Sequence, residues 1–510
     1  MPPNGRYCYK AVLFIRLRDG CNLMRIGDTW AIPALLACVA ALLCLPGYFQ
    51  ADDFGLLAWL RYDRPSPLHW FDVWEMGIWR PFHLAVFWVE TRLFGSNPLG
   101  YRLARGVLSL ATVVVFYHLA QRLFRSPRAA LTAASLFACT YSHWEAVFWI
   151  CASSELWVGF LGAVMGLGVL RAEGAAARRW GSVAVLAHIL ALLAKENAVA
   201  WLPIVAGMVL HQRYAGPRVF PPPALLSGGE EIAKEHKRTR RAAAVRPAAR
   251  MGQTGLWLAL GIPWVLALVG RGYLASGGAA VQSGLFSLWG THVWHNAGAY
   301  LIRLFFPWIP HPPSAWAYGA LAAAVGFCIY AILAKLYRLW LPLGWMFVAL
   351  IPYLGIDTPG YYPSRYTYLA GMGGALLMGE LIEPLWNFSG RIKAAGIAVV
   401  TGYCLLNLSL YAIHPEIRYF QKDDALYRQV VDGLRKLNLP PVPSVAVAGL
   451  DLPLEEKIPN SIRYLYALAY PPPERVWSGE GPWPGTPALI LRWENGVFLV
   501  MPTSKPGGGR

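Results

Sequence analysis

The chain has 510 residues, of which 56% are hydrophobic and 14% charged. Soluble domains have about a quarter of their residues charged, so this composition excludes an ordinary soluble protein and predicts one that crosses the bilayer several times. The net charge of +17 would favour nucleic-acid binding in a soluble chain. Here the basic residues lie in short loops between apolar segments, which the positive-inside bias explains, and we expect no nucleic acid among the partners.

Eleven apolar segments are predicted to cross the membrane as helices. They are residues 30–49, 101–121, 129–149, 154–170, 181–194, 197–211, 256–270, 315–334, 340–356, 366–385 and 394–413. The first of them follows 29 residues instead of a short basic start. We therefore expect an uncleaved membrane anchor and not a signal peptide.

Positively charged residues gather in alternate loops and set the predicted orientation. The loops expected in the cytoplasm carry Arg16, Arg18, Arg25, Arg122, Arg125, Arg128, Arg171, Arg178, Arg179, Lys335, Arg338, Arg391 and Lys393, and the long basic loop 213–254 belongs to the same set. The agreement of six loops predicts a cytoplasmic tail at 1–29 and a C-terminus outside the cytoplasm, in a bacterial plasma membrane.

Two aromatic segments on the opposite side are predicted to lie in the membrane interface without crossing it. Residues 50–100 mix Trp with Arg, and residues 296–309 place Arg303 within an aromatic run. Counting the second segment as a crossing would put Lys335 and Arg338 on the wrong side of the membrane.

The sequence changes character at His414. Residues Asp424–Leu437 have the apolar spacing of an amphipathic helix. Strand-like runs follow at 444–449, 488–493 and 496–501, between turns rich in Pro and Gly. This part of the chain is therefore predicted to form a small α/β domain.

The predicted fold is an all-α polytopic membrane protein at 30–413, with about eleven transmembrane helices and interfacial helices in the first outer loop. A small C-terminal α/β extracytoplasmic domain follows at 414–510. The eight cysteines show no CxxC spacing, and none follows Tyr411. Neither a disulfide framework nor a zinc site is indicated.

The adjacent carboxylates Asp52 and Asp53 are the most informative pair in the chain. They follow the first predicted span after Gln50 and Ala51. Two negative charges at a membrane boundary repel each other and lose hydration, so the pair indicates a catalytic or ion-binding site at the membrane surface. A simpler alternative is that they cap the next helix, since Asp is a favoured N-cap residue.

Further polar residues from distant parts of the chain are predicted to lie at the same outer boundary. They are Arg80, His143, Glu145, Glu155, Lys195, Glu196, Arg271, Arg365 and Tyr366. Because a charge in the bilayer core costs about 2.5–3.5 kcal/mol on insertion scales, such groups usually face a cavity or one another. Their gathering predicts a polar cavity that opens outward. His143 and Glu145 do not share a helical face, so we favour a structural role for them and expect no metal site there.

The charged residues of this group also have structural interpretations. Lys195 and Glu196 could form an ion pair that fills a polar gap, which is as well supported as a catalytic role. Arg80 and Arg365 could extend to lipid headgroups, and we favour that interpretation for Arg80.

Five stretches of the sequence resemble the GT-C superfamily of integral-membrane glycosyltransferases. They are ADDFG (51–55), WRPFHLAVFWVETRLFGSNPLGYRLARGVLSL (79–110), SHWEAVFWI (142–150), LLAKENAV (192–199) and SRYTYLAG (364–371). They occur in the family's order, and the chain looks similar to the protein O-mannosyltransferases and their tetratricopeptide-bearing relatives. The likeness covers roughly residues 30–385, with gaps.

The chain departs from that family at three places. Members often carry His and Asn where this chain has Arg102 and Arg105, and an Arg where Ala152–Ser154 stand. No tetratricopeptide repeat follows the membrane part. These departures concern the acceptor more than the type of reaction.

The resemblance implies an inverting glycosyltransferase that moves a sugar from a polyprenyl-phosphate carrier to an acceptor hydroxyl outside the cytoplasm. It implies Asp52 as the catalytic base. Asp53 would position the acceptor or help to hold a divalent cation such as Mg²⁺ or Mn²⁺. Arg365, Lys195 and Arg80 would bind the carrier phosphate, whose negative charge grows as it leaves.

Glu196, Tyr366 and Glu145 complete the predicted substrate site, and Glu196 would orient Lys195 or contact the acceptor. The acceptor is expected to be a protein, a lipid or a polysaccharide. Two other classes of function remain open. A transporter or lipid flippase would use the same charges to bind an ion or a headgroup, although the sequence shows no pseudo-symmetric halves. A non-catalytic membrane scaffold would bind a partner through the C-terminal domain.

Overall fold

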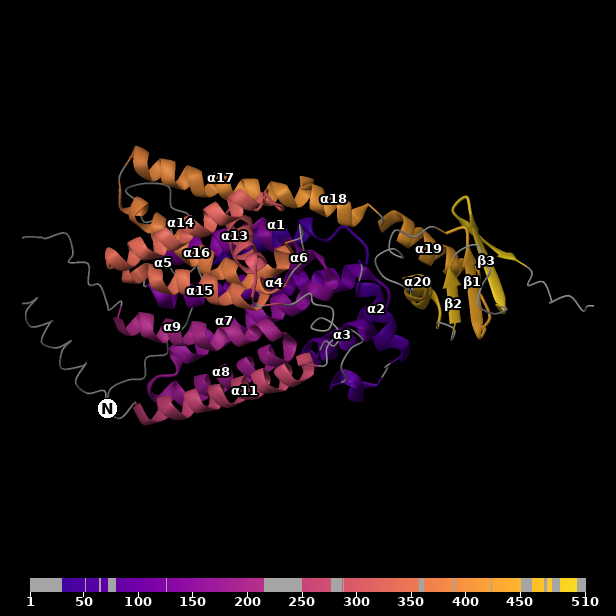
Figure 1. The fold of residues 1–510 in the computed structure, drawn as a ribbon, viewed down its shortest axis with the longest axis horizontal. Helices are drawn as coiled ribbons and strands as arrows, with labels where there is room; N and C mark the ends of the chain where they lie inside the picture. Colours follow the sequence, from indigo (N-terminus) through magenta and orange to yellow (C-terminus); the bar gives the residue numbers. More distant parts are fainter. Residues whose placement is uncertain are drawn as a thin grey trace, which may run out of the picture.

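A computed structural model of the chain describes residues 30–50, 52–63, 66–71, 79–124, 126–214, 250–276, 287, 289–356, 362–388, 390–422, 424–450, 461–471, 475–478 and 487–501. The predicted cytoplasmic tail 1–29 and most of the basic loop 213–254 lie outside the described residues, as does the side chain of Arg271. The described residues form a long bundle of helices with a small sheet at one end (Figure 1).

Each predicted span contains a helix. In chain order these are α1 (Ala31–Leu43), α4 (Pro98–Phe124), α5 (Pro127–Cys139), α7 (Ser153–Arg171), α8 (Ala177–Ala194), α9 (Trp201–Tyr214), α11 (Arg250–Ser276), α14 (Ser314–Leu333), α15 (Tyr337–Leu354), α16 (Tyr368–Ile382) and α17 (Arg391–Ile413).

Six helices in the described part of the chain are long and apolar enough to cross a membrane: α4, α7, α8, α14, α15, and α17 with its extension α18 (Pro415–Gln421). Several of them expose apolar side chains, as α14 does with Val325, Ile329 and Leu333. Soluble monomers rarely expose apolar patches larger than a few hundred Å². These helices indicate an integral membrane protein that crosses the bilayer several times, whereas the predicted number of eleven crossings is not confirmed.

The third predicted span, 129–149, is not one helix. Helix α5 ends at Cys139, and the chain then forms short turns and the five-residue helix α6 (Trp144–Phe148) before α7 begins. The side chain of Asn407 on α17 accepts the N–H of Tyr141 at 2.9 Å where the helix stops. Irregular backbone at membrane depth is tolerated where it is buried in protein, and nearly all of the segment from Tyr141 to Ala152 is buried.

The segment predicted to lie in the interface at 296–309 contains α13 (Thr291–Phe305), and the structure buries most of this helix. Residues Asn296 to Leu304 are buried, and the helix packs on α14 and α15. The guanidinium of Arg303 is wholly buried and forms two hydrogen bonds of 2.8 Å with the carboxylate of Glu416 on α18. Because Glu416 pairs with Arg303, the positive charge of the arginine is neutralised inside the protein, and its side chain need not extend to the lipid surface.

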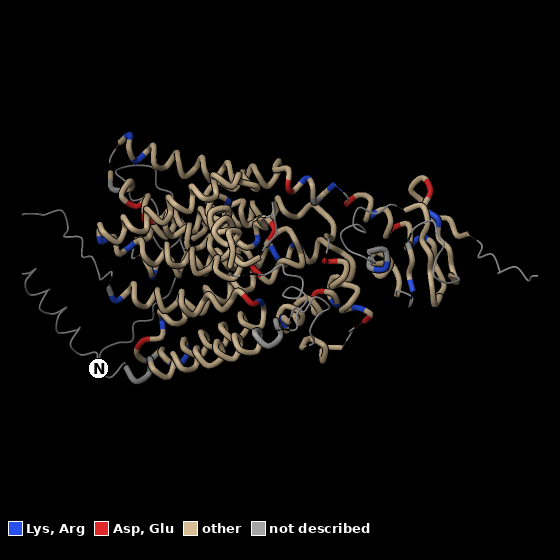
Figure 2. The backbone as a smooth tube through the Cα atoms, viewed as in Figure 1, with Lys and Arg blue, Asp and Glu red and all other residues tan. Residues whose placement is uncertain are grey.

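Several Lys and Arg lie at the end of the bundle away from the C-terminal sheet, on the left of Figure 2. Helix α4 has Arg122 in its last turn, α7 ends with Arg171, Arg178 and Arg179 stand in the first turn of α8, and α17 begins with Arg391. The predicted basic loops that the structure describes therefore share one end of the bundle.

The predicted interfacial segment 50–100 is helical where it is described, at the end of the bundle opposite the basic loops (Figure 1). It contains α2 (Asp52–Ala58), a short π-helix at Trp59–Asp63, a 3₁₀ helix at Pro67–Phe71 and α3 (Pro81–Phe94). Pro81 stands at the first position of α3, where a proline costs no hydrogen bond.

The C-terminal region forms the predicted small α/β domain. Its helices are α19 (Asp424–Lys436) and α20 (Ser461–Ala469), and its strands are β1 (Ser444–Ala448), β2 (Arg475–Ser478), β3 (Leu489–Glu494) and β4 (Val497–Met501). The strand order is β2-β1-β3-β4, with β1 parallel to β2 and β3, and β4 antiparallel to β3.

The hairpin between β3 and β4 follows directly from its sequence. Glu494 pairs with Val497, which leaves Asn495 and Gly496 as a two-residue turn. Both have positive φ, 50° and 81°. An Asn-Gly pair is the favoured sequence for such a turn, because both positions require the left-handed conformation.

The C-terminal domain is not separated from the membrane part by a linker of its own. Helix α2 packs on α20, and the ring of Phe54 lies 5.4 Å from that of Tyr427 on α19. Phe54, Leu57, Tyr427 and Val430 belong to one hydrophobic core that continues into the sheet. The domain is therefore fixed on the helix that carries the acidic pair.

Candidate functional site

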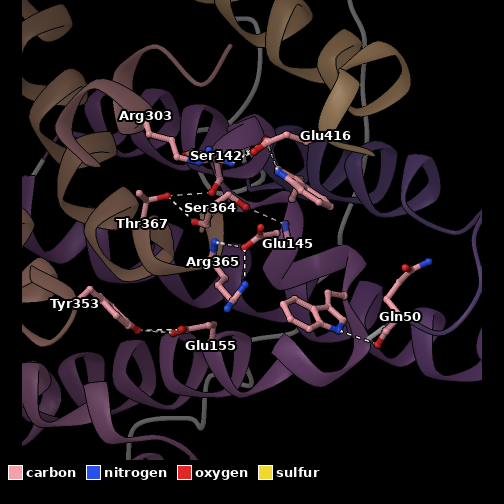
Figure 3. A network of polar contacts seen from close by, with 12 residues as sticks. Gln50, Ser142, Glu145, Glu155, Arg303, Tyr353, Ser364, Arg365, Thr367 and Glu416 are labelled. Atoms are coloured by element: carbon pink, nitrogen blue, oxygen red, sulfur yellow. Dashed lines mark hydrogen bonds and ion pairs between the residues drawn. The ribbon is translucent and has the colours of Figure 1, made fainter. Parts of the chain in front are cut away.

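The predicted site residues lie together at the end of the bundle next to the C-terminal domain. They come from the start of α2, the start of α3, helix α6, the start of α7, the chain between α8 and α9, and the 3₁₀ helix Ser364–Thr367 that precedes α16. The ion pairs and ring contacts described below join most of them into one polar cluster, part of which is drawn in Figure 3.

The two members of the acidic pair are in different environments. Asp53 is wholly buried, and its carboxylate accepts the N–H of Gln50 at 2.9 Å and the N–H of Cys151 at 2.6 Å. Asp53 also donates its own N–H to the carbonyl of Gln50 at 2.8 Å, so the two residues cap the start of α2 reciprocally. Burial raises the pKa of Asp53 to about 7, against the two backbone hydrogen bonds that lower it.

Asp53 therefore does not have the exposed carboxylate that the predicted role requires. Its oxygens face backbone N–H groups and its side chain is 0% exposed, so an acceptor or a cation has no access to it. The capping interpretation, which the sequence left open for both residues, describes Asp53.

Asp52 is only partly buried, and its carboxylate has no hydrogen bond or ion pair with the part of the chain that the structure describes. Burial raises the pKa of Asp52, and the positive charges of Arg365 and Arg80 act against that rise. Both arginines are thus close enough to influence it without pairing with it. An acid in this position is free to accept a proton.

The connection between α1 and α2, residues 44–50, determines where Asp52 stands. The buried Arg102 of α4 donates to the carbonyl of Cys44 at 2.9 Å and to that of Tyr48 at 2.6 Å. Arg102 is one of the positions at which the chain departs from the family it resembles. In this structure the departure fixes the approach to α2.

The C-terminal domain holds the same connection from the other side. Asp424, at the start of α19, accepts the N–H of Tyr48 at 2.8 Å and a hydrogen bond from the side-chain amide of Gln50. The indole N–H of Trp149 donates to the carbonyl of Gln50 at 3.3 Å (Figure 3). This role of Asp424 was not predicted, because its partners lie more than 370 residues away along the chain.

Arg365 and Glu145 form an ion pair (Figure 3). The carboxylate of Glu145, 0% exposed, accepts from the Arg365 guanidinium at 3.0 Å and from its backbone N–H at 3.2 Å. The guanidinium also lies over the rings of Trp149 and Tyr366, at 4.6 Å and 4.8 Å from their centres. Its side chain is 16% exposed, so it is held firmly and still reaches solvent.

Lys195 pairs with Glu155 and not with its sequence neighbour Glu196. The buried carboxylate of Glu155 accepts from the Lys195 ammonium, from the amide of Asn197 at 2.8 Å, and from the hydroxyl of Tyr353 at 2.9 and 3.1 Å. The predicted orientation of Lys195 by Glu196 is therefore wrong. The reason is the extended backbone of Lys195 (φ −162°), which sends the two side chains to different partners.

Arg80 binds Glu196. Its Nε donates to that carboxylate at 3.0 Å, and a second nitrogen forms a further ion pair with it. The interpretation that we favoured, an arginine extending to lipid headgroups, does not describe Arg80, because a partner from the chain between α8 and α9 occupies its fork. The Arg80 side chain is 16% exposed and that of Glu196 47%.

Two aromatic rings connect the Lys195–Glu155 pair with the Arg365–Glu145 pair. Tyr366 stacks on Tyr353 with ring centres 4.2 Å apart, and the Lys195 ammonium lies 5.6 Å from the Tyr366 ring. Tyr366 was a predicted site residue, but Tyr353 and Asn197 were not. Their signal in the sequence is weak, because a Tyr near a helix end is typical of any membrane boundary.

His143 is packed among aromatic rings. Its ring lies 4.7 Å from Phe137 and 5.0 Å from Tyr368, and a Cβ at Gly371 would stand 2.2 Å from its Nε2. No group of three or more His, Cys, Asp or Glu that could hold a metal ion occurs among the described residues. The packing of His143 agrees with the structural role that we favoured.

The cluster thus contains the cations Arg80, Lys195 and Arg365, each paired with a glutamate: Glu196, Glu155 and Glu145 respectively. Asp52 is the one acid of the cluster whose carboxylate has neither a hydrogen bond nor an ion pair in the described residues. The arrangement defines a polytopic helical membrane protein in which the carboxylate of Asp52, unpaired among the described residues, lies near the fixed cations Arg365 and Arg80 at one end of the bundle.

Comparison with known proteins finds similarity to solved structures. ArnT from Cupriavidus metallidurans bound to undecaprenyl phosphate is 13% identical at a TM-score of 0.45, with 91% of this chain and 92% of that chain covered. The apo state of the same ArnT is 16% identical at a TM-score of 0.42. The Archaeoglobus fulgidus oligosaccharyltransferase, in a complex with Zn and sulfate, is 12% identical at 0.43, covering 89% of this chain and 62% of that one.

No protein-family model and no curated protein sequence matches the chain. At these identities and TM-scores the likeness does not decide the activity of this chain, which has to be inferred from its own residues.

Proposed function

We propose that the chain is an inverting glycosyltransferase that moves a sugar from a polyprenyl-phosphate carrier to an acceptor hydroxyl on the extracytoplasmic side of a bacterial plasma membrane. The observation that carries the proposal is the state of Asp52. Its carboxylate is partly exposed and has no partner in the part of the chain that the structure describes, although the cations of Arg365 and Arg80 lie close enough to act on its pKa. A buried structural acid would pair with them; a base that must take up a proton has to stay free.

In the proposed reaction Asp52 accepts the proton of the acceptor hydroxyl as its oxygen attacks the anomeric carbon of the sugar. The bond between that carbon and the phosphate oxygen breaks, and the carrier phosphate leaves with the electron pair. The attack comes from the face opposite the phosphate, so the configuration is inverted. A positioned general base contributes about 10²–10⁴-fold to such a step.

Arg365 and Arg80 are proposed to bind the leaving phosphate. Each guanidinium has five N–H groups of the kind that donate to phosphate oxygens. Both side chains are partly exposed. Lys195 is buried and pairs with Glu155, which also accepts hydrogen bonds from Asn197 and Tyr353. Lys195 would therefore stabilise the phosphate through its charge, without direct contact. Fixed cations of this kind stabilise charge that grows in the transition state.

Asp53 takes a different part in the proposal from the one expected. It caps α2 and joins it to the N–H of Cys151, which keeps Asp52 at the edge of the cluster. Glu145, Glu196 and Tyr366 are proposed to hold the arginines in place, and Glu196, the most exposed of the three glutamates of the cluster, is also proposed to contact the acceptor.

The donor atoms do not fit a divalent-cation site built by the protein. Mg²⁺ prefers several oxygen ligands, whereas the oxygens of Asp53 face backbone N–H groups and those of Glu145, Glu155 and Glu196 face cations or other donors. No step is therefore routed through a metal, and transfer is expected to persist in the presence of a chelator.

The placement of the site outside the cytoplasm rests on the basic end of the bundle, which the positive-inside bias assigns to the cytoplasm. Helix α2, which begins with the acidic pair, and the C-terminal domain lie at the other end (Figure 1). Membrane lipid surrounds the bundle in this arrangement, and the acceptor, a protein, lipid or polysaccharide, approaches beside the C-terminal domain.

The experiment that tests the proposal incubates the purified full chain with a panel of polyprenyl-phosphate sugars, with and without chelator. The expected result is consumption of one of them in the presence of an acceptor-containing membrane extract, and release of free polyprenyl phosphate. If no lipid-phosphate sugar is consumed while the protein remains folded, the proposed function is wrong.

A further inference from the structure

A cavity lies beside the proposed catalytic cluster and shares none of its charged residues. It has a volume of about 760 Å³ and opens to solvent between the membrane part and the C-terminal domain. Its walls are the connection between α1 and α2, the turn between α3 and α4, the short helix after α2, and helices α19 and α20. We call it the interface pocket.

The charged residues that line the interface pocket are Arg61, Arg428, Arg435 and Asp432. Arg435 lies 3.3 Å from Asp432, which leaves an excess of two positive charges. Arg61 makes no hydrogen bond or ion pair with the described residues and lies over the ring of Tyr62 at 5.3 Å. An ordinary solvated surface mixes both signs of charge, whereas arginines converging on a cavity are typical of phosphate or carboxylate recognition.

Arg428 connects the interface pocket with the chain that carries Asp52. Its guanidinium donates to the carbonyl of Gly47 at 3.4 Å and lies 5.3 Å from the ring centre of Tyr48. Gly47 and Tyr48 line the pocket. Asp52 follows Tyr48 by four residues, so their Cα atoms are at most about 14 Å apart. A ligand held in the pocket by an anionic group can therefore extend to Asp52.

We propose that the interface pocket binds an anionic group of the acceptor, a phosphate or a carboxylate, and so sets the acceptor's position relative to Asp52. That the bound anion belongs to the acceptor rests on the proposed transferase function, whereas anion binding itself does not depend on that function. The volume of the pocket admits a phosphorylated or uronic sugar unit or a charged lipid headgroup. The source of the anion, a soluble acceptor or an anionic lipid, is separated by the experiment.

The test uses the full chain in nanodiscs of uncharged phosphatidylcholine and measures binding of glucose 6-phosphate and glucuronic acid by calorimetry, with glucose as the uncharged control. The charged probes are expected to bind and glucose is not. Arg61→Glu is expected to weaken their binding at least about tenfold, because it replaces a charge-assisted donor by a repelling acid. Lys436→Glu is the matched control: Lys436 is exposed on the same helix as Arg435 but does not line the pocket.

Nanodiscs that contain phosphatidylglycerol identify the source. If this lipid weakens binding of glucose 6-phosphate in the wild type, its headgroup enters the pocket, and the acceptor is an anionic lipid. If it has no effect, the pocket takes a soluble anionic acceptor. Either outcome supports an anion site. Absence of binding by both charged probes, equal binding of glucose, or equal affinity in Arg61→Glu and the wild type would overturn it.

Failure of the inference and failure of the proposed function give different results. Asp52→Asn is expected to bind the charged probes as the wild type does, because Asp52 does not line the pocket. A protein that binds anions but consumes no lipid-phosphate sugar would contradict the proposed function and still support the anion site in the interface pocket. If the protein transfers sugar, and Arg61→Glu has the same KM for an anionic acceptor as the wild type, the anion site in the interface pocket is contradicted and the proposed function is still supported.

Discussion

At the scale of single residues, Asp52 and Asp53 have the same side chain and opposite surroundings. Asp53 is closed in by the N–H groups of Gln50 and Cys151, while Asp52 faces the charges of Arg365 and Arg80 without touching them. The sequence predicted that the pair is special and could not separate its members, because Cys151 reaches Asp53 only through the turns that interrupt the third predicted span.

The capping role of Asp53 predicts a loss of stability that is not a loss of catalysis. Asp53→Asn replaces one acceptor oxygen by an N–H₂ group and leaves a buried backbone N–H unpaired, which costs about 1–3 kcal/mol. The midpoint of thermal unfolding of the purified protein should fall, and the folded protein should still transfer sugar. Asp52→Asn is the control and should unfold at the wild-type temperature. Equal stability of Asp53→Asn and the wild type would refute the capping role.

The surroundings of Asp52 predict how the reaction depends on pH. A base must be unprotonated, so the rate falls as the pH drops through the pKa of Asp52, which burial raises and Arg365 and Arg80 lower. Removing one of these charges in Arg80→Gln should raise that pKa and move the acidic limb of the pH–rate profile to higher pH.

The matched control for the pH profile is Arg92→Gln. Arg92 lies on the same helix, α3, and is not among the charges that act on Asp52. Its profile should match that of the wild type. An acidic limb that stays in place in Arg80→Gln, or that moves equally in both variants, would show that Asp52 does not control the rate.

At the scale of elements, the charged cluster depends on helices that end where the hydrophobic pattern continues. Residues 129–149 are apolar throughout, and the pattern predicts one span; the structure ends α5 at Cys139 because Asn407 and Ser364 provide partners for the irregular backbone that follows. Such partners come from helices more than 200 residues away. Local periodicity therefore predicted the other helices well and this break not at all.

The ion pairs within the cluster also could not be predicted from local sequence. The sequence predicted Lys195, Glu196 and Arg80 at one boundary, and the structure pairs Arg80 with Glu196. The sequence suggested a neighbouring pair, Lys195 with Glu196, although the extended backbone at Lys195 directs the lysine to Glu155 and leaves Glu196 to Arg80. Adjacent residues do not face each other even on a helix, so their proximity along the chain did not determine the pairing.

The buried pair of Glu155 and Lys195 predicts a coupled effect on stability. Glu155→Gln leaves the ammonium of Lys195 buried without a counter-charge, and breaking a buried pair in this way costs about 3–5 kcal/mol. Thermal unfolding should therefore begin at a lower temperature. Adding Lys195→Met removes the stranded charge and should recover part of the loss. A double variant less stable than Glu155→Gln alone would contradict this account of the pair.

At the scale of the whole molecule, the distribution of charge and the position of the C-terminal domain define two different ends. The composition predicted a membrane protein with an outer α/β domain, and the structure shows several helices fit to cross a membrane and a small sheet beyond them. Strand β2, helix α20 and the shared core with α2 were not predicted, because their partners are set by packing across the chain.

The proposed orientation predicts which end is accessible from outside the cell. In a background without native cysteines, Lys436→Cys on the C-terminal domain should react with a membrane-impermeant maleimide in intact spheroplasts. Arg391→Cys at the basic end should react only after the membrane is opened. Both side chains are exposed, so accessibility reports the side of the membrane. The reverse pattern would place the site in the cytoplasm.

The most direct test of the central claim compares the wild type with Asp52→Asn for the rate at which a polyprenyl-phosphate sugar is consumed in the presence of acceptor. Both proteins should have the same unfolding temperature, so a difference in rate reports chemistry. Loss of the base predicts a rate lower by about 10²–10⁴-fold. A rate in Asp52→Asn equal to that of the wild type would contradict the account.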